Sequence, residues 1–187
     1  MAGHTGDLPT VLDGLNHEAA EVRVVALGAA QRLDALSVEM LTEALSDPSE
    51  LVRYRAVELV ARASFGQELA PALVAALADP ELSEVAAFAL GELELSGESK
   101  QQAVAALGHQ ATSDEDALCR ESAVAALGAL EDGLSFVLSA TSDVATVRRR
   151  AVLALAPFDG PEVDAALQKA LSDRDWQVRQ AAEDLLA

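Results

Sequence analysis

The sequence is poor in the residues that build sheets and disulfides. Its 187 residues include one cysteine, one tryptophan, one tyrosine and four phenylalanines, and isoleucine is absent. A single cysteine cannot form an internal disulfide, so nothing indicates an oxidising compartment. Few aromatic residues and no isoleucine disfavour β-structure. Alanine fills roughly a fifth of the chain, and it favours helices because it leads the helix-propensity scale.

Basic residues are also few. The 13 lysines and arginines face 31 acidic residues, which gives a net charge of −18 and an isoelectric point near 4.3. Residues 1–93 carry 5 basic and 15 acidic groups, and residues 94–187 carry 8 and 16, so both halves are acidic. A nucleic-acid-binding surface must neutralise phosphates, so that class of function is not expected. An acidic surface instead predicts a protein partner with a basic surface.

Long apolar runs are missing as well. The mean hydropathy is +0.19, and no uninterrupted apolar run approaches the ~18 residues of a transmembrane helix. The first residues, MAGHTGDLPT, have neither a basic flank nor an apolar stretch, which predicts no signal peptide. Lysine and asparagine are nearly absent alongside isoleucine, which is typical of a GC-rich coding sequence. We therefore expect a bacterial, cytoplasmic protein without membrane contact.

A short motif recurs along the chain: an apolar residue, usually followed by arginine, with an alanine four positions on. The copies begin at Val22, Val52, Val85, Cys119, Val147 and Val178, which are spaced 30, 33, 34, 28 and 31 residues apart. Together with an apolar residue at the eighth position, they form the i, i+4, i+8 face of an amphipathic helix. A second apolar helix precedes each copy. Every unit is therefore expected to be a helix hairpin that buries its apolar stripe against its neighbours.

Two copies carry a family resemblance. They read Asp47-Pro48-x-x-x-Val52-Arg53-x-x-Ala56 and Asp173-x-Asp175-x-x-Val178-Arg179-x-x-Ala182. These motifs resemble the HEAT-like repeat family, in particular its short-repeat, phycobilin-lyase-type branch. The resemblance implies an all-α, right-handed α-solenoid of six HEAT-like helix hairpins whose second helices line a concave face. We expect a single domain over residues 1–187, with repeats at approximately 7–34, 37–64, 66–94, 97–130, 131–158 and 160–187.

The third and fourth copies depart from the pattern. Ala86 stands where the other copies have arginine, and one extra residue precedes Val85. In the fourth copy, about five surplus residues fall within 109–116, between Leu107 and Cys119. Stacking between the third and fourth units is therefore expected to be irregular.

The arginine of the motif recurs in five copies, as Arg23, Arg53, Arg120, Arg148 and Arg179. The family resemblance and the acidic turns favour a structural role, in which each arginine ties down a turn and Asp47 and Asp173 act as acceptors. A guanidinium fork matches a carboxylate well. A basic stripe that binds a ligand is the alternative.

The two positions that follow the arginine are expected to face the concavity. They supply the candidate partner-binding residues Tyr54, Arg55, Phe88, Glu121, Arg149 and Arg150. Together these side chains would form a mixed aromatic and charged contact surface. For each residue alone, an ordinary solvated helix face is the alternative.

Three further features have a structural and a functional interpretation. Trp176 is expected to pack on the preceding repeat, and a partner anchor is the alternative. The segment Asp114-Glu115-Asp116 is either a solvated loop with helix-starting charge or a docking point for a basic peptide. Cys119 occupies a valine position, which predicts a small buried side chain.

Catalytic and metal sites are not indicated. The histidines His4, His17 and His109 lack the spacing of metal ligands. The di-iron site of HEAT-like hydroxylases needs several His-Glu dyads, and this chain has one, His17-Glu18. Phosphate-binding loops and nucleophile elbows are missing too, so no cofactor is expected.

We therefore expect a non-catalytic protein-binding scaffold or adaptor that uses the concave face of an acidic helical repeat. The alternative is a chromophore (bilin) lyase or a lyase-accessory subunit, which only the family resemblance supports. The last helix ends at Leu185-Leu186-Ala187 without a polar cap. Since terminal repeats normally need a polar outer face, this end predicts weak self-association through the C-terminal repeat.

Overall fold

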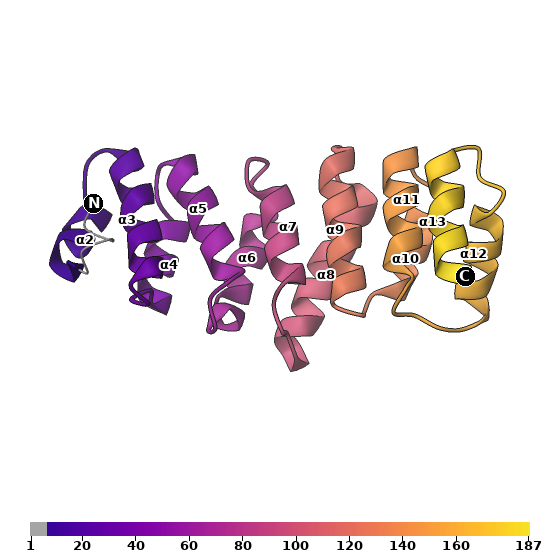
Figure 1. Ribbon diagram of the computed structural model, residues 1–187, viewed down its shortest axis with the longest axis horizontal. Coiled ribbons are helices and arrows are strands. Elements are labelled where there is room, and N and C mark those ends of the chain that lie inside the picture. The colour runs from indigo at the N-terminus through magenta and orange to yellow at the C-terminus, as the bar shows by residue number, and fades with distance from the viewer. Residues whose placement is uncertain (1–6) are drawn as a thin grey trace.

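The computed structural model describes residues 7–187, and this part of the chain is all-helical (Figure 1). Even-numbered helices are α2 (Leu8–Leu15), α4 (Val38–Leu45), α6 (Ala70–Ala76), α8 (Gly97–Ser113), α10 (Leu134–Ala140) and α12 (Pro161–Ala170), with a 3-10 helix, η1 (Gly66–Leu69), before α6. Odd-numbered helices are α3 (Ala20–Arg32), α5 (Glu50–Val60), α7 (Ser83–Gly91), α9 (Ala117–Ala129), α11 (Ala145–Ala154) and α13 (Trp176–Leu186). The all-α prediction is confirmed.

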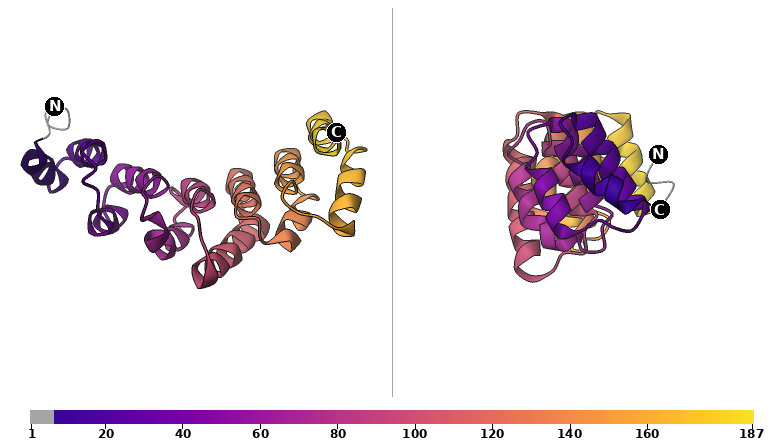
Figure 2. Two further views of the ribbon diagram at one scale, coloured as in Figure 1. Left: turned by 60° about the horizontal axis from the view of Figure 1, so that its bottom comes forward. Right: turned by 90° about the vertical axis from the view of Figure 1, so that its left-hand side faces the viewer.

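The helices from α3 to α13 alternate between two layers of an elongated arc. Figure 2 shows the odd-numbered helices on the inner side of the arc and α4 to α12 on the outer side. Each odd-numbered helix contacts the next one, from α3 with α5 to α11 with α13. Helices α2 and α13 lie at opposite ends of the arc (Figure 1).

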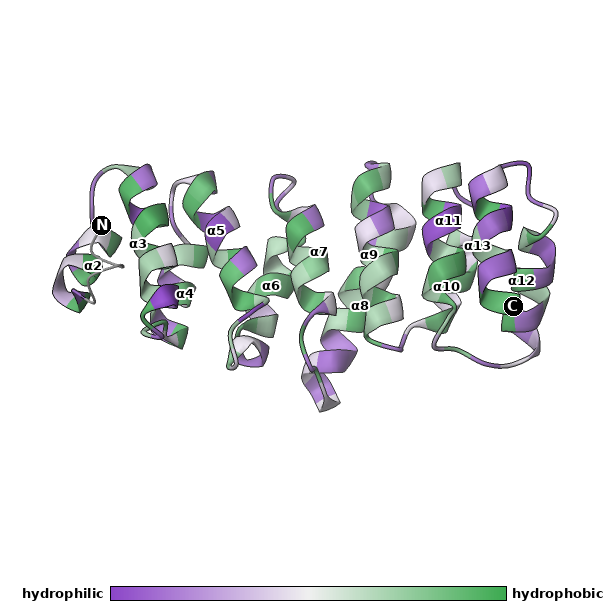
Figure 3. Ribbon diagram, in the orientation of Figure 1, coloured by the Kyte–Doolittle hydropathy of each residue, from purple (hydrophilic) through white to green (hydrophobic). Residues whose placement is uncertain are grey.

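The main apolar core runs between the layers, and a second, smaller cluster joins α2 to α3. Leu41, Leu59, Leu90, Leu107 and Leu127 are fully buried within the main core. Figure 3 shows both hydrophobic and hydrophilic residues on the inner helices. No helix within residues 7–187 is both long and apolar enough to cross a membrane.

The third motif copy begins three residues earlier than the sequence pattern predicted. In the second copy, Val52, Ala56 and Val57 of α5 are buried. The buried residues with the same spacing in the third copy are Leu82, which directly precedes α7, and Ala86 and Ala87 within α7. Val85, with which the sequence pattern begins this copy, is only half-buried. The copy therefore starts at Leu82, 30 residues after Val52 and 37 before Cys119. This register places Ser83, not Ala86, at the arginine position.

Most of the surplus residues of the fourth unit lengthen a helix. Helix α8 has 17 residues, whereas α4 has 8 and α12 has 10. Residues 109–113 are therefore helical, and the chain turns only at 114–116. The extension brings Gln110 against the start of α7, where its Nε2 donates to Ser83 Oγ at 2.6 Å. The irregularity expected between the third and fourth units is a longer helix at this junction.

Candidate binding groove

The motif arginines form a regular series along the turns. We call Arg23, Arg53, Arg120, Arg148 and Arg179 the arginine ladder. In Arg148, Nε and Nη2 donate to the two carboxylate oxygens of Asp173 at 2.9 and 2.7 Å. The same two-pronged bond joins Arg23 to Asp47 and Arg120 to Asp143, and Arg53 makes a single bond of 3.2 Å to Asp79. In each pair the aspartate belongs to the following unit, so the ladder links neighbours.

Each ladder arginine also holds the turn before its own helix. Arg148 Nη1 donates to the carbonyl of Asp143 at 2.8 Å, and Arg179 Nη1 donates to that of Asp173 at 2.7 Å. The hydrogen bond from Arg148 is the largest cause of the lowered pKa of Asp173, and burial opposes it. The pKa of Asp47 is lowered by Arg23 in the same way. The interpretation that Asp47 and Asp173 accept from motif arginines is confirmed.

Two adjoining cavities of about 490 and 360 Å³ lie over α5, α7, α9 and α11. They share Glu84, Phe88, Glu92 and Ser122 as lining residues. We call the larger one the acidic groove; its aromatic and charged lining consists of Tyr54, Phe88, Glu58, Glu81, Glu84, Glu92, Asp116 and Arg62. Five carboxylates thus face one guanidinium, and this excess attracts cations.

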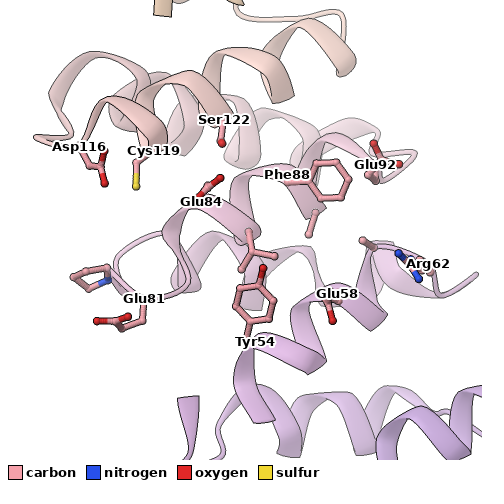
Figure 4. A pocket seen from close by; sticks show the side chains of 14 residues that line it. Tyr54, Glu58, Arg62, Glu81, Glu84, Phe88, Glu92, Asp116, Cys119 and Ser122 are labelled. Carbon is pink, nitrogen blue, oxygen red and sulfur yellow. The ribbon is translucent and has the colours of Figure 1, made fainter. Parts of the chain in front are cut away.

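Both aromatic side chains line the acidic groove, Tyr54 near its middle and Phe88 toward one end (Figure 4). In Figure 4, Tyr54 projects from α5 toward α7, and the Phe88 ring stands on α7 near Glu92 and Arg62. Glu81 and Asp116 lie at the other end of the groove (Figure 4). Tyr54 is 44% exposed and Phe88 is 57% exposed. Exposed rings among carboxylates form a surface that favours a cationic group, because a ring face attracts positive charge.

The structure brings four of the six candidate partner-binding residues to these cavities. Tyr54 and Phe88 line the acidic groove, while Phe88, Glu121 and Arg150 line the smaller cavity. Arg150 Nη2 pairs with Glu121 at 3.2 Å, so these two side chains partly neutralise each other.

The other two candidates lie outside both cavities. Arg55 pairs with Glu58 at 2.9 Å and donates to Gln31 on α3 at 3.4 Å. Arg149 is exposed on α11 and lines neither cavity. Arg55 and Arg149 therefore stay predictions as contact residues, without support from the groove.

Sequence reasoning missed the carboxylates of the groove. With the third copy set at Leu82, Glu84 holds the position that Tyr54 holds in the second copy. Glu58 and Phe88 likewise share one position, one helical turn further on. The wrong register of the third copy hid Glu84, whereas the four-residue spacing along one face would have found Glu58.

Other predicted features have mixed outcomes. Cys119 is buried, as expected, and this burial raises the pKa of its thiol. Trp176, which was expected to pack on the preceding repeat, is 64% exposed, so most of its surface makes no such contact. His4 lies outside the described residues. Within residues 7–187, no three His, Cys, Asp or Glu side chains are placed to hold a metal ion.

No protein-family model matches the chain, and a search of curated proteins finds no significant match. The likeness to HEAT-like repeats therefore rests on the motif residues.

Proposed function

We propose that the chain is a right-handed α-solenoid of six HEAT-like helix hairpins that works as a non-catalytic scaffold. The two-layered arc and the arginine ladder, which joins neighbouring units through repeated bonds, support this architecture. In this proposal a protein partner binds on the inner side of the arc. The inner helices are already ordered there, so association immobilises few additional groups.

The exposure of Phe88 and Tyr54 in the acidic groove is the observation that supports binding most strongly. The chain has few aromatic residues, yet these two lie in one cavity, and each exposes more than two fifths of its surface. Aromatic side chains in a pocket are typical anchors of protein interfaces. The surrounding carboxylates favour a partner with a basic surface, and salt should weaken its binding.

Capture of the partner followed by variant binding tests this proposal. The tagged protein retains its partner from a native lysate, and mass spectrometry identifies it after elution with stepped salt. Binding of the purified partner is then measured with the wild type and with Phe88→Ser. We expect Phe88→Ser to weaken binding at least about tenfold, because it removes a central apolar anchor.

Leu51→Ser is the matched control, since Leu51 is 58% exposed on α5 but lines neither cavity. It should bind like the wild type. Equal affinity of the wild type and Phe88→Ser would overturn the groove as the binding surface. If no protein is retained, titration with a bilin tests the chromophore-lyase alternative through a shifted visible absorption band.

A further inference from the structure

We propose that the acidic groove takes an arginine side chain of its partner at a gap in the arginine ladder, between Ser83 and Asp114. The inference rests on the proposed function and adds the chemistry of the partner. It assigns to Asp114 the role of the acceptor that ladder aspartates play for arginines of this chain.

Asp114 has the geometry of a ladder aspartate. Its carboxylate accepts the backbone N–H of Asp116 at 2.8 Å, and its carbonyl accepts Arg120 Nη1 at 2.9 Å. Asp47 makes the same two bonds, with Ser49 and Arg53. Asp47 also receives Arg23 from the preceding unit, whereas no ion pair of Asp114 occurs within residues 7–187.

The gap exists because the preceding unit has no arginine at its ladder position. Its residue at the ladder position is Ser83, which is buried and bonded to the Gln110 amide of the lengthened α8. Gln110 is only 5% exposed, and its Oε1 is buried without a hydrogen-bond partner. The junction therefore holds a ladder carboxylate without its guanidinium and a buried acceptor without a donor. A guanidinium supplies several N–H donors in one plane, which suits the open carboxylate of Asp114.

The gap lies at one end of the acidic groove. Glu81, Glu84, Asp116 and Cys119 line this end (Figure 4), and Asp114 adjoins it because its carboxylate accepts the backbone N–H of Asp116. A basic chain that crosses the groove would meet Tyr54 and Phe88 next, and both rings can stack on a guanidinium. Arginine fits this site better than lysine because its fork matches the two-pronged bond of the other ladder aspartates.

Titration with N-acetyl-L-arginine amide, followed by two-dimensional amide NMR spectra of the full chain, tests the site. N-acetyl-citrulline amide is the control ligand, since it keeps the shape of arginine and lacks the charge. We expect the arginine compound to shift amide signals in segments 79–84 and 114–122, and the citrulline compound to leave them in place. Arginine shifts spread evenly over the acidic surface would overturn the proposal.

Two matched variants complete the test. Asp114→Asn keeps an oxygen for the Asp116 N–H and should weaken arginine binding at least about fivefold, because the guanidinium loses its countercharge and one of two acceptor oxygens. Asp159→Asn removes one exposed carboxylate outside the groove and should bind like the wild type. Equal binding by both variants would refute the assignment of Asp114.

Ser83→Arg provides an independent test of the site. An arginine from this chain would fill the gap, so we expect the arginine-induced shifts to disappear while the unfolding midpoint stays level or rises. If this variant fails to fold, the comparison of Asp114→Asn with Asp159→Asn still decides. A captured partner that depends on Phe88 but binds equally well to Asp114→Asn would overturn this inference and leave the scaffold proposal standing.

Discussion

At the scale of single residues, the ladder pairs differ in how far they are removed from water. The side chains of Arg148 and Asp173 are 7% and 16% exposed, whereas those of Arg53 and Asp79 are 22% and 32% exposed. The first pair also has two short bonds and the second has one longer bond. Since exposed ion pairs are screened by solvent, the pairs should contribute unequally to stability.

Asp173→Asn and Asp79→Asn should therefore lower the free energy of unfolding by different amounts. Asp173→Asn leaves the buried Arg148 guanidinium without its countercharge and should lower the free energy of unfolding by about 2 kcal/mol. Asp79→Asn should lower it by less than about 1 kcal/mol. Both asparagines can still accept the backbone N–H that the aspartate holds, so the difference reports the ion pair. Urea unfolding followed by circular dichroism measures both, and equal losses would contradict the ranking by burial.

The ladder was predictable in its residues and only partly in its partners. A Val-Arg step beside acidic turns indicates the arginines and two of the acceptors, Asp47 and Asp173. The partner unit is not readable from the spacing, because each arginine reaches both its own turn and the next one. Asp114 shows the limit: its local sequence resembles that of a paired aspartate, and only the structure shows that the preceding unit has Ser83 at the ladder position.

At the scale of helices, close approach depends on small residues at the contacts. A Cβ atom added to Gly108 of α8 would lie 2.3 Å from the Phe136 ring of α10. The equivalent addition to Gly28 of α3 would meet only the ends of the Arg32 and Arg55 side chains, at 3.4 Å. The first glycine is required by packing between helices, and the second is not.

Alanine at the two glycines should therefore have opposite effects. Gly108→Ala forces α8 and α10 apart or displaces the Phe136 ring, and should lower the free energy of unfolding by about 1–3 kcal/mol. Gly28→Ala gains helix propensity where the new methyl group meets only the ends of two long side chains, and should raise the free energy of unfolding by about 0.5–1 kcal/mol. Thermal unfolding of both variants checks the signs. A stabilised Gly108→Ala would mean that α8 and α10 leave room for a methyl group at this contact.

The helices themselves were predictable from the apolar period, but the register of one unit was not. In the third copy, both Leu82 and Val85 are apolar residues with an alanine four positions on. Leu82 is the buried first residue of this copy, because the neighbouring helices α5 and α9 enclose α7 from both sides. The composition of α8 gives no sign that it continues through 109–113, so the surplus residues looked like a loop.

At the scale of the whole molecule, two electrostatic terms oppose each other. The net charge of −18 means that the excess carboxylates repel one another in the compact chain at neutral pH. The ladder aspartates Asp47, Asp143 and Asp173, in contrast, have pKa values lowered by their arginines, which means that their charged forms stabilise the fold. Mild acid relieves the first term before it removes the second, since the net charge approaches zero near the isoelectric point of 4.3.

We expect stability to stay level or rise as the pH falls from 7 to about 5, and to decline below about pH 4. A carboxyl group with a lowered pKa in the folded chain contributes its stability above the pKa of the unfolded chain. That contribution is lost as the pH falls through the folded value, where the proton breaks the bond to arginine. Urea unfolding at a series of pH values measures the profile.

Asp173→Asn should be less stable than the wild type at pH 7 and should decline less steeply in acid, whereas Asp159→Asn should follow the wild type. A stability that keeps rising below pH 4 in the wild type would show that relief of repulsion outweighs the ladder throughout the molecule.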